Sequence, residues 1–281
     1  MTHDWTAITV TYNSAGALRR CWGGFDGSFR WVVVDNASTD DSVAVAEELG
    51  ATVFRQPSNV GFSRANNRAL RQVETQFVAF VNPDVTVASG SLHRLEATAC
   101  AGAVVAPQLT FPDGSVQPNG RGLPFVVDKL AHRGVRVPFA RVAEYAPAPG
   151  ADLLPVDWVM GAAVAGTTAT MRRLGGWDGR YFIYYEDHEL GLRAWSRGVP
   201  VLVDPNVRWV HEWSRDTARW SPLHWRYEIG SAARFFAAYP LLVMPWRGPA
   251  GARYGSRTAH ARQALQDVTS RMDAANDGGP R

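Results

Sequence analysis

The chain has 281 residues, of which 46% are hydrophobic and 20% are charged, and its net charge is +3. This balance is typical of a soluble globular protein with room for one large α/β domain and an accessory segment. No apolar run approaches the ~20 residues of a membrane-spanning helix, and no secretory signal is visible at the start. We therefore expect a cytoplasmic protein.

The positive charge comes almost entirely from arginine, because Lys129 is the only lysine. Arginine binds phosphate groups with two parallel hydrogen bonds. An arginine excess can equally reflect a GC-rich genome, so charge alone identifies no ligand. The two cysteines, Cys21 and Cys100, show neither metal-ligand spacing nor a pairing pattern, and we expect both to be small buried hydrophobes.

The first third of the chain alternates between strand and helix patterns. Four short apolar runs predict strands at 7–11, 31–34, 51–55 and 77–81. The intervening helices are expected through Leu18 and Cys21, from Val43 to Leu49, and from Phe62 through Val73. This alternation indicates right-handed βαβ units and a Rossmann-like, mostly parallel sheet. The glycine-rich dinucleotide and P-loop fingerprints are both missing, so a nucleotide would be held in another way.

The rest of the chain is less regular. Residues 104–111 read as one arm of a hairpin with a turn at 112–114, and 118–155 as a long loop rich in Pro, Gly and Arg. Further strands are predicted at 156–165, 199–203 and 207–211. Helices are predicted from Thr167 or Thr168 to Gly175, at 184–197 and at 222–239. We expect the polar tail after Gly248 to be frayed.

Polar residues follow several of the predicted strands. Asn82-Pro-Asp84 ends the strand at 77–81, and Tyr12 and Asp35 end two others. Ligands of open α/β sheets bind beyond the carboxyl ends of the strands. There Asp84 can hold a divalent cation against phosphates, Asp35 can accept the imide N–H of uracil or thymine, and Tyr12 can stack on the base. The alternatives are that Asn-Pro-Asp merely turns the chain and that Asp35 caps a helix.

A second group of candidates lies later in the chain. Glu186 and Asp187 begin a predicted helix after two tyrosines, where acids are stabilised by the helix dipole or can act as a general base. His211 ends a strand and is followed by Arg215, so the imidazole can complete a metal shell and the guanidinium can clamp a phosphate. A lone histidine in such a place is more often structural.

Several motifs together carry a family resemblance. They are Thr9-Val-Thr-Tyr-Asn13, Val34-Asp-Asn-Ala-Ser-Thr-Asp-Asp-Ser42, Asn59-Val-Gly-Phe62 with Ala65-Asn-Asn67, Asn82-Pro-Asp84, Gly176-Trp-Asp-Gly-Arg-Tyr-Phe182 and Glu186-Asp187. In this order they resemble the family 2 glycosyltransferases of the GT-A fold, over about residues 6–215. The most similar branch is the rhamnosyltransferases of bacterial surface polysaccharide, which include enzymes acting on polyprenyl-diphosphate-linked N-acetylglucosamine.

The resemblance implies roles for particular residues. Asp187 matches the catalytic base and Glu186 its supporting partner. Asp84 matches the last residue of the family's Asp-x-Asp motif and would bind Mg²⁺ or Mn²⁺ together with His211, while Asn82 replaces the first aspartate. The other expected donor-binding residues are Thr11, Tyr12, Asp35, Asn59, Arg64, Asn67 and Arg215. The sugar or acceptor pocket is expected to include Trp158, Gly161, Trp177 and Asp178.

The implied activity is inverting transfer of a sugar from a nucleoside diphosphate, linked to dTDP or UDP, to a hydroxyl of a glycan or polyprenyl-linked acceptor. L-Rhamnose from dTDP-rhamnose is the best candidate. Two rivals remain open: a glycosyltransferase acting on modified nucleic acid, and a catalytically silent sugar-nucleotide-binding module.

The expected organisation is a GT-A domain at 1–215, a helical segment at 216–247 and a flexible tail at 248–281. The helical segment is apolar and contains two arginines, Arg234 and Arg247. It either touches the inner face of the membrane or packs on the core. Its apolar residues are Phe235, Phe236, Tyr239, Leu241, Leu242, Val243 and Trp246.

Overall fold

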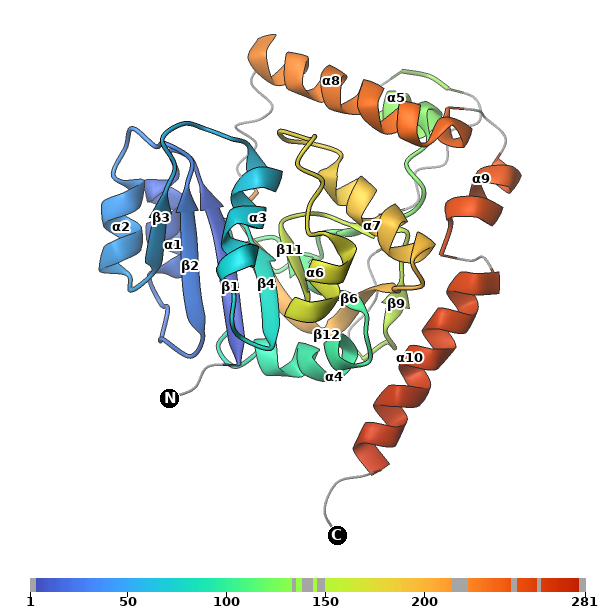
Figure 1. The fold of residues 1–281 in the computed structure, drawn as a ribbon, viewed down its shortest axis with the longest axis horizontal. Helices are drawn as coiled ribbons and strands as arrows, with labels where there is room; N and C mark the ends of the chain where they lie inside the picture. Colours follow the sequence, from blue (N-terminus) through green and yellow to red (C-terminus); the bar gives the residue numbers. More distant parts are fainter. Residues whose placement is uncertain are drawn as a thin grey trace.

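The computed structural model describes residues 4–132, 135–137, 144–145, 150–213, 222–243, 247–256 and 259–277. Figure 1 shows a central sheet with helices on both faces. The described part of this sheet has nine strands, in the order β3-β2-β1-β4-β11-β6-β12-β5, with β9 paired to β12. Four neighbouring strands run parallel: β3 (Thr52–Arg55), β2 (Arg30–Asp35), β1 (Trp5–Thr11) and β4 (Phe77–Val81). They confirm the four strands predicted in the first third of the chain.

The other half of the sheet is mixed in direction. β11 (Ala163–Thr167) runs antiparallel to β4 and to β6 (Val104–Thr110), while β12 (Val201–His211) runs parallel to β6. β5 (Val85–Thr86) and β9 (Leu154–Pro155) pair antiparallel with β12. β6 is therefore an interior strand of the sheet. Its end also forms the predicted hairpin, since Thr110 bridges Val116 in the antiparallel direction and the N–H of Phe111 donates to the carbonyl of Ser115 around the turn.

Three other strand predictions were wrong in their boundaries. The predicted strand at 156–165 is split between β10 (Trp158–Val159) and β11, and β10 joins β7 (Gly120–Arg121) and β8 (Glu144–Tyr145) in a second sheet. The strands predicted at 199–203 and 207–211 form the single strand β12, because a register shift between Asp204 and Arg208 lets pairing with β6 continue past Pro205.

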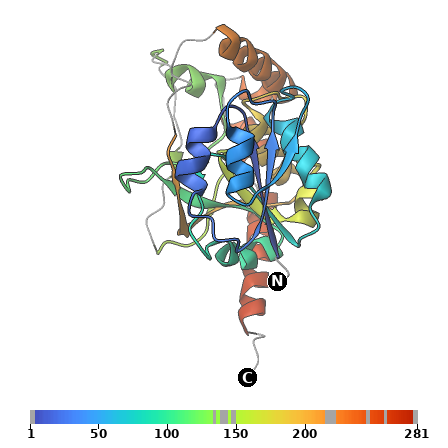
Figure 2. The same cartoon turned by 90° about the vertical axis from the view of Figure 1, so that its left-hand side faces the viewer.

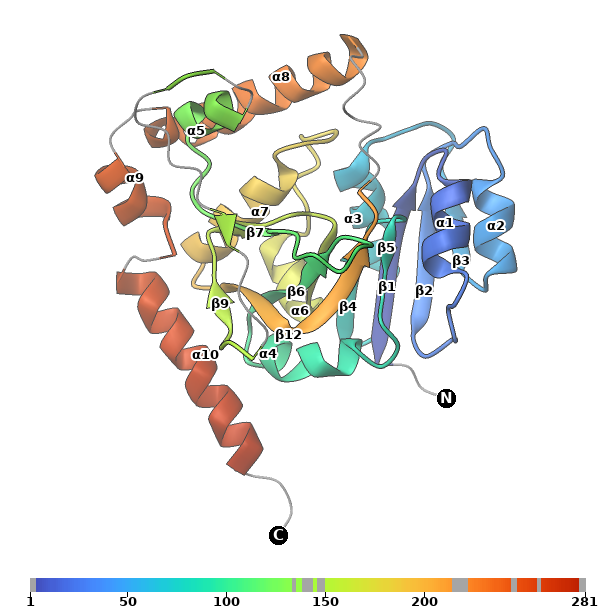
Figure 3. The same ribbon diagram turned by 180° about the vertical axis from the view of Figure 1, so that it is seen from behind.

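The helices divide between the two faces of the sheet (Figures 1 and 3). α1 (Ala15–Trp22), α2 (Ser42–Glu48), η1 (Leu92–Leu95) and α4 (Glu96–Cys100) pack on one face. α3 (Phe62–Gln72), α6 (Thr168–Leu174) and α7 (Glu186–Ser196) pack on the other. Figure 2 views the same layers from the β3 side. Neighbouring strand residues such as Ala7 and Ile8 belong to different clusters, as the alternation of side chains in a strand requires.

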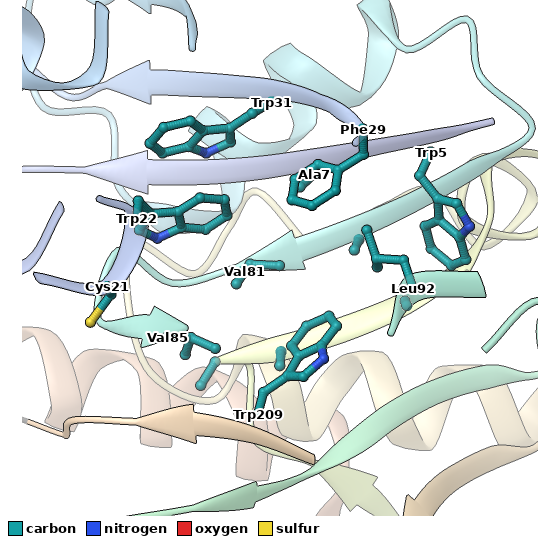
Figure 4. Close-up of a cluster of buried hydrophobic side chains, with 14 of the residues drawn as sticks. Trp5, Ala7, Cys21, Trp22, Phe29, Trp31, Val81, Val85, Leu92 and Trp209 are labelled. Atoms are coloured by element: carbon teal, nitrogen blue, oxygen red, sulfur yellow. The ribbon is translucent and has the colours of Figure 1, made fainter. Parts of the chain in front are cut away.

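The first of these clusters is rich in aromatic side chains (Figure 4). Trp22 stacks on Trp31 with 4.2 Å between the ring centroids. Cys21 is buried in the same cluster, and burial raises the pKa of its thiol to about 11, which keeps it protonated. The expectation of burial was wrong for Cys100, which is exposed near the C-terminal end of α4.

Segments predicted to be irregular contain further helices. α5 (Val126–His132) interrupts the loop predicted at 118–155. α8 (Pro222–Ala238) confirms the helix predicted at 222–239, and η3 (Pro240–Leu242) and α9 (Arg247–Tyr254) follow it in the chain. α10 (Ala259–Asp277) replaces the frayed tail, since its Val268 is buried in a cluster with Ala101 and Leu202. Within the described residues, none of the helices combines the length and apolar content needed to cross a bilayer.

The apolar residues of the segment at 232–247 pack inward where they are described. Phe235 and Leu242 are fully buried in one cluster with Tyr185 of the α7 entry, and Phe236, Tyr239 and Leu241 pack against it. Val243 is exposed, and Trp246 lies outside the described residues. The structure therefore favours core packing over membrane contact for most of this set.

The backbone of α7 lies very close to β10, and Gly191 permits this approach. A Cβ on Gly191 would lie 2.5 Å from the Cβ of Trp158 and 2.6 Å from the carbonyl oxygen of Asp157. We predict that Gly191→Ala destabilises the fold by about 1–3 kcal/mol through overpacking, despite the better helix propensity of alanine. The control is Gly230→Ala in α8, where a Cβ meets nothing within 4 Å and stability should hold or rise. Urea denaturation measures both; equal stability of the two variants would contradict the prediction.

Candidate active site

The ends of β1 and β2 lie side by side, with Thr11 in register with Asp35. Tyr12, the next residue, is 52% exposed. Asp35 is buried, and its carboxylate accepts the backbone N–H of Ser38 at 3.1 Å. Asp35 thus orders the loop before α2 but does not cap this helix, whose N-cap residue is Asp41.

Asp84 and His211 face each other across the β5–β12 pair. Their side chains approach to 3.5 Å between Asp84 Oδ1 and His211 Nε2, and the backbone N–H of Glu212 donates to the carbonyl of Asp84 at 2.9 Å. The imidazole is buried, whereas the carboxylate is 20% exposed. Glu212, the residue after His211, forms an ion pair with Arg20 at 2.8 Å.

His211 also contacts Gln117, which sequence reasoning missed. His211 Nδ1 lies 2.7 Å from Gln117 Oε1, and the tautomer in which Nδ1 donates to this oxygen leaves the Nε2 lone pair open toward Asp84. The backbone around Gln117 is held in turn by Gln108, whose Nε2 donates to the Gln117 carbonyl and to Asn119 Oδ1. Such outer-shell support is typical of histidine ligands.

Asp187 is held at the N-terminus of α7 by three hydrogen bonds. Its Oδ1 accepts the backbone N–H of His188 at 2.8 Å and His188 Nδ1–H at 2.5 Å, and its Oδ2 accepts the backbone N–H of Gly161 at 3.2 Å. The His188 ring stacks on Trp158 with 3.6 Å between centroids. The chain enters this helix through Tyr184 and Tyr185. Both residues have left-handed backbone conformations with a φ of 69°.

The neighbouring carboxyls of Glu186 and Asp187 titrate differently. Burial and the charge of Asp187 raise the pKa of Glu186 well above its ordinary value, and Glu186 Oε2 has no hydrogen-bond partner among the described residues. Burial also opposes ionisation of Asp187, but His188 and Lys129 outweigh it and lower its pKa. Burial lowers the pKa of His188 to about 4, so this imidazole is neutral at neutral pH. Asp187 therefore carries the charge, as a base requires.

Asp187 and the Asn82–Asp84 turn are joined through one short segment. Gly161 donates its N–H to Asp187, while the carbonyl of the next residue, Ala162, accepts the N–H of Asn82 at 2.9 Å. Trp213 provides a second link, since it stacks near His211 and lines a cavity that also contains Asp187. The segment Gly161-Ala162 thus contacts both Asp187 and the turn that carries Asp84.

Other expected site residues make structural contacts. Asn67 binds the backbone of Trp177 twice, at 2.6 and 2.9 Å, and Arg64 donates to the carbonyl of Gly179 at 2.9 Å. Trp177 is buried against Phe62 and Phe80. These contacts hold the loop that precedes α7, and a role in donor binding stays a prediction.

The remaining expected residues are placed as follows. Asn59 Oδ1 accepts the N–H of Gly61 at 3.0 Å. Burial opposes the charge of Asp178, but hydrogen bonds from Arg180 outweigh it and lower the pKa of this carboxyl. Arg215 lies outside the described residues.

The raised pKa of Glu186 predicts how the free energy of unfolding changes with pH. Its folded-state pKa is raised, so the folded protein binds more protons than the unfolded chain, and stability falls as pH rises above the ordinary value of 4.5. The amide introduced by Glu186→Gln cannot ionise, so this variant does not lose stability in this way as pH rises. We expect its advantage over the wild type to grow with pH, up to about 1–3 kcal/mol, the usual cost of an unsatisfied buried group. Urea denaturation from pH 5 to 8 measures it.

The matched control is Glu189→Gln in the same helix. Glu189 pairs with Arg193 at 2.8 Å, and both side chains are largely buried. Removal of one partner of a buried ion pair should destabilise by about 3–5 kcal/mol. If Glu186→Gln destabilises like the control at every pH, Glu186 is ionised and paired instead.

Comparisons with known proteins show which family and fold this chain resembles. Residues 6–141 match the model of glycosyl transferase family 2. The chain is 28% identical, over 78% of its length and 79% of the relative's, to N-acetylglucosaminyl-diphospho-decaprenol L-rhamnosyltransferase of Mycobacterium tuberculosis.

Two solved structures show the same fold at low sequence identity. The mannosyltransferase PcManGT of Pyrobaculum calidifontis, in complex with GDP-Man and Mn²⁺, is 18% identical with a TM-score of 0.58, over 100% of this chain and 77% of that one. GalNAc-T7 with UDP, GalNAc and Mn²⁺ is 15% identical with a TM-score of 0.60, over 94% of this chain and 55% of that one. Residues 6–141 are therefore similar to glycosyl transferase family 2, the chain has a GT-A fold, and its sequence is similar to that of a rhamnosyltransferase.

Proposed function

We propose that the chain is an inverting, metal-dependent glycosyltransferase that moves L-rhamnose from dTDP-rhamnose to a hydroxyl of a lipid-linked glycan. The observation that carries this proposal is the link through Gly161 and Ala162, which contact Asp187 and the Asn82–Asp84 turn respectively. A charged base and a cation-binding carboxylate, linked by one short segment, are the two groups that such a transfer requires.

In the proposed reaction Asp187 takes the proton of the acceptor hydroxyl. The acceptor oxygen forms a bond to the anomeric carbon while the bond from that carbon to the diphosphate oxygen breaks, and its electrons leave with the nucleoside diphosphate. This single displacement inverts the anomeric centre. Glu186, kept neutral by burial beside Asp187, leaves one carboxylate as the base.

Asp84 and His211 fit a divalent cation. The side chains of His211 and Asp84 face each other, and the tautomer in which Nδ1 donates to Gln117 leaves Nε2 open for a metal. Across the described residues, no group of three or more His, Cys, Asp and Glu side chains could hold a metal ion. Diphosphate oxygens and water would therefore complete the shell, as is usual for Mg²⁺. Mg²⁺ or Mn²⁺ would there neutralise the charge that builds on the leaving diphosphate.

The donor base is proposed to lie against the ends of β1 and β2. Tyr12 offers an exposed ring for stacking, and Asp35 offers a carboxylate oxygen for the N3–H of thymine or uracil. The choice of a rhamnosyl donor and a lipid-linked acceptor rests on the relative from Mycobacterium tuberculosis, whose name contains both. A Cβ on Gly161 would lie 3.5 Å from the Cβ of Asp187, so a larger side chain at this position would press against the proposed base.

The role of Asp187 predicts the behaviour of Asp187→Asn. Asparagine keeps one oxygen, which can still accept the N–H groups of His188, but it loses the acceptor for the N–H of Gly161 and cannot take a proton. We expect transfer to fall by about 10²- to 10⁴-fold, the usual contribution of a positioned base, while the donor still raises the melting temperature as in the wild type. The matched control is Asp204→Asn in β12, outside the site. Unchanged turnover in Asp187→Asn would remove this residue from the mechanism.

The role of Asp84 predicts a metal-dependent loss of nucleotide affinity. In Asp84→Ala we expect dTDP binding to weaken at least 10-fold in the presence of Mg²⁺ or Mn²⁺, and to respond little to EDTA, because the carboxylate ligand is gone. Isothermal titration calorimetry with and without EDTA measures both effects. Thymidine, which has no phosphates, serves as the control ligand and should bind both proteins equally. A variant that binds dTDP like the wild type would place the cation elsewhere.

A further inference from the structure

The two carboxylate oxygens of Asp187 have different surroundings. Oδ1 accepts two hydrogen bonds from His188, one from its backbone N–H at 2.8 Å and one from its ring atom Nδ1 at 2.5 Å. Oδ2 accepts the N–H of Gly161 at the longer distance of 3.2 Å. A carboxylate oxygen has two lone pairs, so both pairs of Oδ1 are in use, while Oδ2 has a second pair beyond its bond to Gly161. Oδ2 is therefore the better placed oxygen to take a proton.

The ring of His188 is held as a neutral donor. The lowered pKa of Asp187 keeps its carboxyl ionised despite burial, so its oxygens can only accept, and the shared proton belongs to Nδ1. Nε2 is buried and has no hydrogen-bond partner among the described residues. A second proton there would be a buried N–H without an acceptor, and burial lowers the pKa of His188 to about 4. The imidazole thus has one proton, which is directed at Asp187.

Three aromatic rings from different parts of the chain hold this imidazole in place. It stacks on Trp158 of β10 with 3.6 Å between the centroids, and it also packs against Tyr185 at 4.9 Å and against Phe235 of α8 at 5.7 Å. The side chain of His188 is 7% exposed, whereas that of Asp187 is 17% exposed and lines a cavity of about 320 Å³. Asp187 is thus open to a ligand and His188 is not.

Charged groups from two further elements face the same pair. Lys129 of α5 and Arg121 of β7 add to the effect of burial in lowering the pKa of the imidazole, and Lys129 also lowers that of the Asp187 carboxyl. Asp128 of α5 lines the cavity together with both cations. Glu186, beside the base, is kept neutral by its raised pKa. The two cations therefore oppose a second proton on the imidazole and favour the ionised base.

We propose that His188 is a positioning residue, whose imidazole holds Oδ1 of Asp187 so that Oδ2 takes the proton of the acceptor hydroxyl. The proposal rests on the proposed function. The proton moves from the acceptor oxygen to Oδ2, and the electron pair left on the acceptor oxygen forms the bond to the anomeric carbon. His188 keeps its own proton on Nδ1 throughout. Its hydrogen bond also stabilises the charged carboxylate in its buried position.

The test follows the ionisation of Asp187 by NMR of isotope-labelled aspartate carboxyls, with Asp187→Asn to assign the signal. His188→Phe keeps an aromatic ring against Trp158 but removes the ring N–H. We expect the midpoint of the Asp187 titration to move up by about 1–2 pH units, which corresponds to the loss of one hydrogen bond to a charged group. The side-chain amide introduced by His188→Asn can donate in place of Nδ1, so this variant should titrate near the wild type.

The matched control is His93→Phe, the same substitution at a histidine that also contacts a carboxylate. His93 Nδ1 lies 2.7 Å from Glu96 Oε1 and belongs to η1, on the other face of the sheet from α7. This variant should leave the Asp187 titration unchanged. An unchanged midpoint in His188→Phe would overturn the proposal. So would a midpoint in His188→Asn that moves as far as in His188→Phe, because ring packing and not the N–H would then be responsible.

A measurement on the wild type decides the case in which His188→Phe does not fold. Nitrogen NMR of the imidazole should find its proton on Nδ1, no proton on Nε2 and no titration between pH 5 and 8. A ring protonated on Nε2 contradicts the proposal. These ionisations are measured at equilibrium, so they test how His188 acts on Asp187 even if transfer from dTDP-rhamnose is not observed, a result that counts against the proposed function.

Kinetics add a second readout where transfer is observed. His188→Phe should lower kcat by about 10- to 100-fold, as misplacement of a catalytic group does, and leave the KM of the donor unchanged. A higher KM with an unchanged kcat would show that His188 supports donor binding and does not position the base.

Discussion

The site depends on the close approach of α7 to the segment that carries β10 and the turn into β11. Gly191 allows the helix backbone to touch Trp158, and the N–H of Gly161 then reaches the carboxylate of Asp187. Both contacts join residues that lie far apart in the chain. A shift of α7 would move the base away from the Asn82–Asp84 turn, because Ala162 fixes that turn from the other side. The geometry of the base is therefore a property of tertiary packing and not of α7 alone.

The same contact explains how two adjacent carboxyls can be buried. Three N–H groups stabilise the charge of Asp187, while Glu186 has no comparable set and holds its proton to higher pH. The left-handed backbone at Tyr184 and Tyr185 adds strain at the same place. Packing of the Tyr185 ring against Phe235 of α8 helps to offset that strain. The buried carboxyl of Glu186 and the left-handed backbone thus reduce stability around the proposed base, as is common at functional sites.

The extent to which the sequence predicts the fold and the candidate site differs along the chain. The parallel strands and their polar ends follow from local patterns, so Tyr12, Asp35 and Asp84 could be identified in advance. The mixed half of the sheet could not be predicted in this way. β6 pairs with β11 and β12 across long stretches of chain, and its sequence fits a hairpin equally well. Gln117, His188 and Lys129 also escaped prediction, since a glutamine, a histidine or a lysine carries no signal until its partner is known.

Substitutions at the strand ends and substitutions in the cavity beside Asp187 differ in their effect on stability. The proposed donor side is built on strand ends, and the sheet that fixes them is buried on both faces. The cavity beside Asp187 is built on short elements between residues 120 and 132 and on Trp213, which is 41% exposed. Substitutions at Lys129 or Arg121 alter the cavity without disturbing the central sheet, whereas a substitution at Asp35 also removes a hydrogen bond that orders the chain before α2. The lining of this cavity can therefore change at a lower cost in stability than the strand ends can.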